Sequence, residues 1–139
     1  MISYRLNNTD RTFAGDPEET LLDHLRLEHK ITSPKDGCSG QGVCGACSVE
    51  INGKIKMACR TRMKDLEGAI INTIEGLPEE FTTVLGNNFA AKGAVQCGFC
   101  SPGMIMRAKG LYNINTSPSR EEIKKAITPN LCRCTGYVK

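Results

Sequence analysis

The stretch Cys38-Ser39-Gly40-Gln41-Gly42-Val43-Cys44-Gly45-Ala46-Cys47 contains three cysteines and three glycines within ten residues. Glycine has no side chain, so the backbone can wrap tightly and aim its N–H groups at the cysteine sulfurs. This composition predicts a loop that presents three thiolates to a metal centre. A fourth thiolate, Cys59, follows a predicted β-hairpin over residues 48–57, whose Asn52-Gly53 pair is typical of a type I′ turn. The hairpin should return the chain so that Cys59 lies near Cys47.

A second group of four cysteines lies in the other half of the chain, at Cys97, Cys100, Cys132 and Cys134. Its two close pairs are separated by helix-rich sequence and must be brought together by folding. Ligation by sulfur alone favours zinc or an iron-sulfur cluster over magnesium or calcium. Only one residue separates Cys132 from Cys134, whereas structural zinc sites usually have two or more residues between paired cysteines. The spacing therefore favours an iron-sulfur cluster over zinc.

Composition argues against several classes of protein. The 139 residues include 8 cysteines and no tryptophan, and their formal charge of +3 is spread along the chain without a basic block. Nucleic-acid binding therefore has little support. We find no apolar run long enough for a membrane span and no signal-peptide core, so we expect a cytoplasmic protein. In that compartment thiols stay reduced and available to metal, which argues against eight cysteines paired as disulfides.

The first half of the chain alternates apolar and polar residues in a way that predicts strands. These strands are expected over residues 1–7 and 69–74, with another around residues 11–14. Between them, Asp16 is followed by a proline and two glutamates, which predicts a helix capped by Asp16 and ending near Glu28.

His24 and His29, the only histidines, fall on this predicted helix. Residues five apart do not share a face of an α-helix, so the two imidazoles are not expected to meet. We interpret them as partly exposed helix residues and not as metal ligands.

The second half of the chain changes to a helical pattern. Gly76-Leu77-Pro78 marks the predicted boundary, and a helix is expected over residues 79–92. Ser101-Pro102 predicts the start of a second helix. Ser119 with Glu122 forms a capping box for a third helix, which Pro129 should end.

With both cysteine groups and their flanking residues, the chain resembles the small iron-sulfur subunit of the molybdenum hydroxylases. That family includes xanthine dehydrogenase, aldehyde oxidoreductase and aerobic-type carbon monoxide dehydrogenase. The resemblance covers nearly the whole chain, and an ordinary plant-type ferredoxin lacks the last two of the strings that carry it. These strings are Leu21-Leu22-Asp23-His24-Leu25-Arg26, Lys35-Asp36-Gly37-Cys38, Cys44-Gly45-Ala46-Cys47-Ser48-Val49, Thr73-Ile74-Glu75-Gly76-Leu77, Gln96-Cys97-Gly98-Phe99-Cys100-Ser101-Pro102-Gly103 and Asn130-Leu131-Cys132-Arg133-Cys134-Thr135-Gly136-Tyr137.

The resemblance implies an α+β protein made of two domains. Residues 1–76 would form a β-grasp domain of the plant-type ferredoxin kind with one 2Fe-2S cluster. Residues 77–139 would form a small four-helix-type domain with a second 2Fe-2S cluster, and each cluster would staple a domain too small to bury a large core. The expected ligands are Cys38, Cys44, Cys47 and Cys59 for the first cluster, and Cys97, Cys100, Cys132 and Cys134 for the second.

The resemblance also implies an electron-transfer subunit of an oxidoreductase complex, with no catalytic residue of its own. A large catalytic subunit would hold molybdopterin and a medium subunit would hold FAD. Single electrons would pass from molybdopterin through the two clusters toward FAD or another acceptor. Gln96 and Cys134 occupy motif positions that approach the pterin in the family. Two alternatives stay open: a free-standing two-cluster ferredoxin and a zinc-stapled interaction module.

The chain departs from the family pattern at two places. Five residues separate Cys38 from Cys44, where family members commonly have four, so the loop must bulge or Cys38 must approach iron differently. The sequence also ends at Lys139, where relatives usually continue with another helix. We expect the first cluster to form with all four cysteines despite the longer loop.

Overall fold

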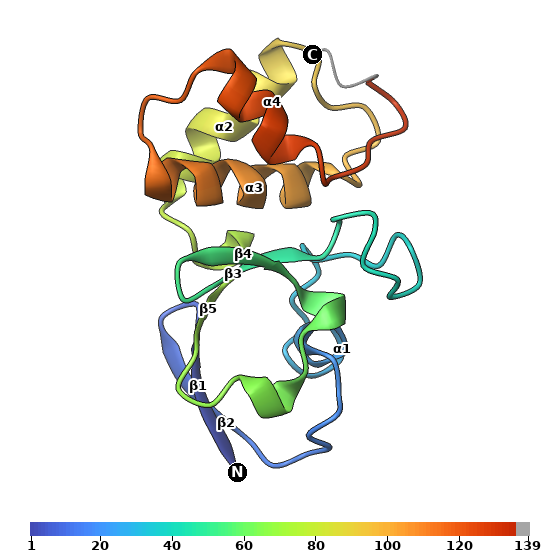
Figure 1. Ribbon diagram of the computed structural model, residues 1–139, viewed down its shortest axis with the longest axis vertical. Coiled ribbons are helices and arrows are strands. Elements are labelled where there is room, and N and C mark those ends of the chain that lie inside the picture. Colours follow the sequence, from blue (N-terminus) through green and yellow to red (C-terminus); the bar gives the residue numbers. More distant parts are fainter. Residues whose placement is uncertain (136–139) are drawn as a thin grey trace.

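The computed structural model describes residues 1–135 and shows strands and helices segregated along the chain (Figure 1). We call residues 1–76 the sheet region and residues 77–135 the helical region. The strands are β1 (Ile2–Leu6), β2 (Thr9–Phe13), β3 (Ser48–Ile51), β4 (Lys54–Met57) and β5 (Ile70–Asn72). The helices of the helical region are α2 (Glu79–Ala91), α3 (Ser101–Ile114) and α4 (Arg120–Ile127).

The five strands form one mixed sheet in the order β2-β1-β5-β3-β4. β1 pairs antiparallel with β2 and parallel with β5, while β3 pairs antiparallel with both β5 and β4. The β3–β4 hairpin has its predicted bounds, and Asn52 and Gly53 adopt the positive φ angles, 51° and 81°, that a type I′ turn requires. β5 is shorter than predicted because the chain turns into a 3₁₀ segment, η4 (Ile74–Gly76).

One apolar core lies against the sheet. Tyr4 and Leu6 point into it from β1, whereas the alternating residues Ser3 and Arg5 are exposed. A short helical segment covers this face of the sheet and contributes leucines to the core. The largest fully buried members of the core are Leu21, Leu25, Val49, Met63, Leu66 and Ile71.

This helical segment begins later than the sequence predicts. It consists of α1 (Leu21–Asp23) and a π-helical turn, η1 (His24–Glu28), so the predicted end is correct and the predicted start is wrong. Thr20 is the N-cap, because its Oγ1 accepts the N–H of Asp23 at 3.1 Å. The Asp16 carboxylate instead accepts a backbone N–H two residues further on, a local turn that competes with helix formation.

The π-helical turn also overturns the prediction for the two histidines. In a π-helix the hydrogen bond joins residues five apart, and the N–H of His29 donates to the carbonyl of His24 at 3.3 Å. The two side chains therefore share a face, with ring centroids 4.8 Å apart. His24 is buried, not partly exposed, because this face turns toward the sheet.

The three helices of the helical region begin close to their predicted positions, and α2 and α4 also end close to theirs. Ser119 and Glu122 make the predicted capping box: the Ser119 hydroxyl accepts the N–H of Glu122 at 3.2 Å, and the Glu122 carboxylate accepts the N–H of Ser119 at 2.6 Å. Cys100, not Ser101, occupies the N-cap position of α3, so the serine is already the first helical residue.

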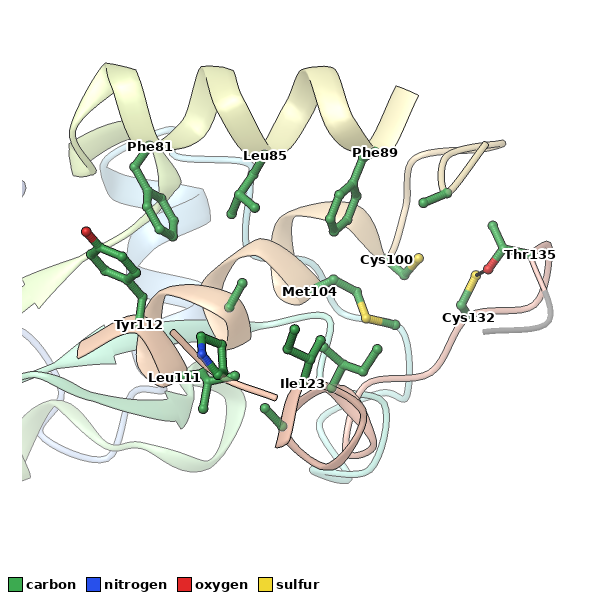
Figure 2. Close-up of a pocket in the computed structure, with 15 residues that line it drawn as sticks. Phe81, Leu85, Phe89, Cys100, Met104, Leu111, Tyr112, Ile123, Cys132 and Thr135 are labelled. Carbon is green, nitrogen blue, oxygen red and sulfur yellow. Dashed lines mark hydrogen bonds between the residues drawn. The ribbon is translucent and has the colours of Figure 1, made fainter. Parts of the chain in front are cut away.

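The helical region is more loosely packed than the sheet region. Neither α2 nor α4 has a fully buried residue. The apolar sides of the helices instead line a cavity of about 340 Å³ (Figure 2). Within residues 1–135 this region contains three α-helices, where the resemblance implies four, and none of the described helices has the length and apolar composition needed to cross a membrane.

α3 joins the two regions by lying across β3 and β4 (Figure 1). Glu50 of β3 is buried in this junction, where its carboxylate accepts hydrogen bonds from Asn72 at 2.9 Å and from Asn113 of α3 at 2.6 Å. Lys109 of α3 adds an ion pair at 3.4 Å. Burial raises the pKa of Glu50, but these partners together lower it below its usual value. A buried carboxylate therefore fixes α3 to the sheet through contacts from both sides.

Candidate iron-sulfur sites

The first cysteine group lies between the loop before β3 and the turn after β4. Cys44, Cys47 and Cys59 are buried, and Cys38 is partly exposed. Two backbone N–H groups point at buried sulfurs: that of Ala46 at Cys44 Sγ, 3.4 Å away, and that of Cys59 at Cys47 Sγ, 3.5 Å away. The second contact confirms that the hairpin brings Cys59 next to Cys47.

The five residues between Cys38 and Cys44 begin with a tight turn. The N–H of Gln41 donates to the carbonyl of Cys38 at 3.2 Å, with Ser39 and Gly40 at φ angles of 55° and 74°. The Asp36 carboxylate supports this turn by accepting the N–H of Gly40 at 3.1 Å. This turn is consistent with a bulged loop, one of the two outcomes that the spacing allows.

The turn also directs backbone N–H groups at the Cys38 sulfur. Hydrogen bonds from Val43 chiefly, and also from Cys44 and Gly42, lower the pKa of the Cys38 thiol to about 7 despite some desolvation. A thiolate is the form that binds metal. The loop therefore stabilises the charge that a cluster ligand must carry.

Two other sulfurs of this group, those of Cys44 and Cys59, lie in surroundings that oppose negative charge. Burial, followed by the neighbouring Cys47 and Cys38 sulfurs, raises the pKa of Cys59 to about 12. Burial also raises the pKa of Cys44, and its contact with Cys38 adds to the effect. Burial thus opposes the thiolate form of both residues, and bound iron would supply the compensating positive charge.

The second cysteine group is brought together at one end of the helical region. Cys97 and Cys134 lie with their sulfurs 3.6 Å apart. Cys100 and Cys132 lie at the end of the apolar cavity, as Figure 2 shows. The Thr135 hydroxyl, 3.2 Å from the Cys132 sulfur, is the main cause that lowers the pKa of Cys132 to about 7. Burial, with the adjacent Cys132, raises the pKa of Cys100 to about 11.

The thiols of both groups are arranged in pairs. Among the described residues, no three His, Cys, Asp or Glu side chains converge as ligands of one metal ion. A 2Fe-2S cluster instead takes two thiolates at each of its two irons. The donor set fits this requirement, because contacts between sulfurs that shift a pKa link Cys38 with Cys44, Cys97 with Cys134, and Cys100 with Cys132, while Cys47 is a cause of the raised pKa of Cys59 and accepts its N–H.

A buried asparagine ties the two groups to each other. Asn130, with 1% of its surface exposed, donates from Nδ2 to the Gly45 carbonyl at 3.0 Å and accepts from Arg107 Nε of α3 at 2.9 Å. Gly45 has φ of +73°, and a Cβ there would lie 2.5 Å from Asn130 Oδ1. Next to it, the N–H of Leu131 donates to the carbonyl of Cys44 at 2.9 Å. The backbone between two ligands of one group is thus joined to the segment that leads into the other.

Sequence reasoning assigned no role to Asn130, and it gave Gly45 only the role of letting the loop wrap tightly around the sulfurs. Their contact joins residues 85 positions apart, which no local pattern indicates. Gln96, which the resemblance places near the pterin, is exposed and donates from Nε2 to the carbonyl of Cys134 at 3.0 Å. The structure therefore brings together the two candidates for the cofactor side. Gly136 and Tyr137, the end of the last quoted string, lie outside the described residues.

Comparison with known proteins supports the same division of the cysteines. Residues 15–84 match the model of a "2Fe-2S iron-sulfur cluster binding domain", and residues 73–139 match that of a "[2Fe-2S] binding domain". Each match contains one complete group of four cysteines. The fold and the two sites thus define an iron-sulfur protein with two 2Fe-2S clusters.

Individual relatives cover almost the whole chain. The nicotinate dehydrogenase small FeS subunit of Eubacterium barkeri is 44% identical over 99% of this chain and 88% of its own length. The nicotine 6-hydroxylase small subunit of Paenarthrobacter nicotinovorans is 43% identical over 98% of this chain and 82% of its own. The crystal structure of quinoline 2-oxidoreductase from Pseudomonas putida 86 contains a chain that superposes with a TM-score of 0.90 at 40% identity, covering 99% of this chain and 85% of that one.

These similarities place the protein among known electron-transfer subunits. The chain belongs to the family of small iron-sulfur subunits of the molybdenum hydroxylases. Aldehyde oxidoreductase of Megalodesulfovibrio gigas is 45% identical over 95% of this chain but only 15% of its own length, so there the same unit is part of a much longer polypeptide. The predicted role as the non-catalytic electron-transfer subunit of an oxidoreductase complex is therefore confirmed.

Proposed function

We propose that Cys38, Cys44, Cys47 and Cys59 bind one 2Fe-2S cluster and that Cys97, Cys100, Cys132 and Cys134 bind the other. The pairing of the thiols within each group carries this assignment, because it matches the two thiolates that each iron requires. Each bound cluster supplies a one-electron acceptor and donor. The chain's own residues hold the thiolates, shield three of the four sulfurs of the first group from water and aim N–H groups at sulfur.

Under this proposal residues 1–76 are a domain of β-grasp type and residues 77–139 are a helical cluster-binding domain. The sheet order and the single core of the sheet region support the first assignment. The connection at Gly76-Leu77-Pro78, between η4 and α2, supports the boundary.

The second cysteine group would face a large molybdopterin-binding subunit, with Gln96 and Cys134 on the cofactor side. Cys97 and Cys134 are exposed, and the apolar side chains of Phe99 and Leu131 beside them are 43% and 54% exposed. Exposed apolar surface of this kind favours a protein interface around the sulfurs. The hydrogen bond between Gln96 and Cys134 would hold the amide next to the cluster ligand.

Single electrons would then pass from the second group to the first, and on toward FAD of a medium subunit or another acceptor. The order follows the resemblance to the family, and the bond from the Leu131 N–H to the Cys44 carbonyl supports direct transfer between the two groups, because it joins their backbones. We place the complex in the cytoplasm, where eight thiols stay reduced until iron binds.

Analysis of iron, sulfide and zinc together with electron paramagnetic resonance of the reduced chain tests the cluster assignment. We expect two distinct 2Fe-2S signals, with Cys47→Ala removing one and Cys97→Ala removing the other. A single cluster in the unmodified protein, or zinc in place of iron, would contradict the assignment. Purification from the native host tests the partner separately, because a free-standing ferredoxin would not co-purify with a molybdenum subunit.

A further inference from the structure

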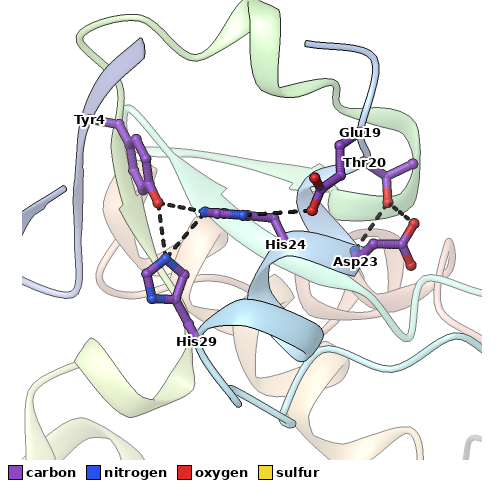
Figure 3. A network of polar contacts seen from close by, with 6 residues as sticks. All are labelled: Tyr4, Glu19, Thr20, Asp23, His24 and His29. Carbon is purple, nitrogen blue, oxygen red and sulfur yellow. Dashed lines mark hydrogen bonds and ion pairs between the residues drawn. The ribbon is translucent and has the colours of Figure 1, made fainter. Parts of the chain in front are cut away.

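A cluster of polar side chains lies inside the sheet region, apart from both cysteine groups. Tyr4 of β1 places its hydroxyl 2.6 Å from His24 Nε2 and 3.0 Å from His29 Nε2. The two Nε2 atoms are themselves 3.2 Å apart. Figure 3 shows these three atoms facing one another between the strand and the π-helical turn. Three potential ligand atoms from two separate elements therefore converge on one point.

This convergence depends on the π-helical turn. An α-helix would direct residues 24 and 29 to different faces, whereas the wider turn presents both imidazoles to β1. Tyr4 and His24 are 4% and 5% exposed, and His29 is partly buried and lies toward the surface. A cation could therefore reach these three side chains past His29 and would be shielded from water once bound.

The other nitrogen of His24 indicates which tautomer the site favours. Nδ1 has no hydrogen-bond partner, but Glu19 Oε1 lies 3.7 Å from it (Figure 3). A proton on Nδ1 would face this carboxylate and leave the lone pair of Nε2 directed at Tyr4 and His29. A carboxylate behind a histidine is the common arrangement at metal sites, where it fixes the tautomer and orientation of the ligand.

The charged groups around Tyr4, His24 and His29 have opposing effects on the binding of a cation. Burial is the largest cause that lowers the pKa of both histidines, which keeps them in the neutral form that binds metal. Arg11 of β2 adds a nearby positive charge that opposes a cation, whereas Glu19 and Glu28 add negative charges that favour one. The two carboxylates outnumber the guanidinium.

We propose that His24 Nε2, His29 Nε2 and the Tyr4 hydroxyl bind one divalent cation of the zinc type, with water completing the coordination. Imidazole nitrogen is a preferred ligand of zinc, and three protein ligands with one open position are an established zinc geometry. The ion would clamp β1 to the π-helical turn. Both cysteine groups remain fully available for their clusters, because no thiol takes part.

Zinc absorption spectroscopy on the untagged chain with both clusters loaded tests this site. Loaded clusters occupy the thiols, and the chain has only two histidines, so any imidazole scattering must come from His24 and His29. We expect one equivalent of zinc with nitrogen and oxygen neighbours at about 2.0–2.1 Å. Zinc–sulfur distances of about 2.3 Å, or no zinc bound beyond the background, would overturn the proposal.

Variants then identify the ligands. His29→Gln should weaken zinc binding about 100-fold, and Glu19→Gln, which removes only the carboxylate behind His24, about 10-fold. Tyr4→Phe should also weaken binding, whereas Tyr112→Phe, at an exposed tyrosine of α3, should leave it unchanged. An unchanged visible spectrum of the clusters shows that each variant is folded. Unaltered zinc binding in His29→Gln and Glu19→Gln together would exclude the site.

Discussion

The sheet region and the helical region hold the same number of cysteines but bury them differently. In the sheet region three of four cysteines are buried within or beside one continuous core. In the helical region Cys97 and Cys134 are exposed, α2 and α4 bury no residue, and the helices surround a cavity of about 340 Å³. In the sheet region the thiols lie beside an apolar core that is already complete. In the helical region they lie where little apolar core is present.

This difference indicates what each cluster does for its region. The sheet region has the larger buried apolar core, so we expect it to hold its loop in place before iron binds. The helical region has little, so its second cysteine group must supply the cross-link that packing does not. The exposed position of that group is also what an interface with a partner requires.

Removal of both clusters by a chelator under reducing conditions should produce the largest difference in amide hydrogen exchange between the two regions. We expect amide hydrogen exchange in α2 and α4 to accelerate about 100-fold, because no buried side chain holds them, while β1 and β5 keep most of their protection. Exchange measured by mass spectrometry, segment by segment, checks this. An equal loss of amide protection in the two regions would contradict the view that only the helical region depends on its cluster.

A large-to-small substitution in each region should sharpen the same comparison. Leu25→Ala, in the fully buried core, should cost about 2–5 kcal/mol. Leu85→Ala, which lines the existing cavity, should cost less than about 1.5 kcal/mol, because the side chain is incompletely packed. Thermal and denaturant unfolding of the cluster-loaded chain compares the two, and a larger cost at Leu85 would contradict this view of the helical region.

The junction between the regions should depend on Asn130. Asn130→Ala leaves the Gly45 carbonyl and the Arg107 guanidinium without these buried partners, at about 1–3 kcal/mol each. We expect lower stability and a weaker magnetic interaction between the two reduced clusters. Asn87→Ala, at an exposed asparagine of α2, is the matched control. An unchanged interaction in the Asn130 variant would show that α3 alone sets the spacing.

Acid should destabilise the sheet region through its two histidines when zinc is absent. Burial lowers the pKa of His24 and His29 below the value of 6.5, so the unfolded chain binds more protons and stability falls as the pH drops through that value. The slope should be at most about 1.4 kcal/mol per pH unit for each histidine. Unfolding between pH 8 and 5.5 measures it, and His29→Leu should flatten the curve.

The capping box of α4 should show the smallest effect. Ser119→Ala removes the hydroxyl that accepts the Glu122 N–H and should cost about 1 kcal/mol. Because the helical region has little core, this loss should appear as faster exchange in α4 and leave β1 unchanged. Exchange that rises equally in both would mean that the regions unfold together.

Local patterns predicted much of the fold. The β3–β4 hairpin follows from Asn-Gly, and α4 follows from its capping box and Pro129. Local patterns did not predict the late helix start at Thr20, which is decided by the side-chain hydrogen bonds of Asp16 and Thr20. They also did not predict the π-helical turn, where His24 packs against Tyr4 and Phe13. Local propensity is a weak guide where tertiary contacts choose.

The sequence by itself determined the class of protein, because the two cysteine groups and the strings around them carry the resemblance to the small subunits of the molybdenum hydroxylases. It also separated the cysteines into their two groups. Only the tertiary structure decided how those groups are joined, through Asn130, Gly45 and the Leu131–Cys44 bond. The tertiary structure also decided that the side chains of Tyr4, His24 and His29 contact one another. Such contacts link residues distant along the chain or on an unusual helical turn, and their geometry exists only after the whole chain has packed.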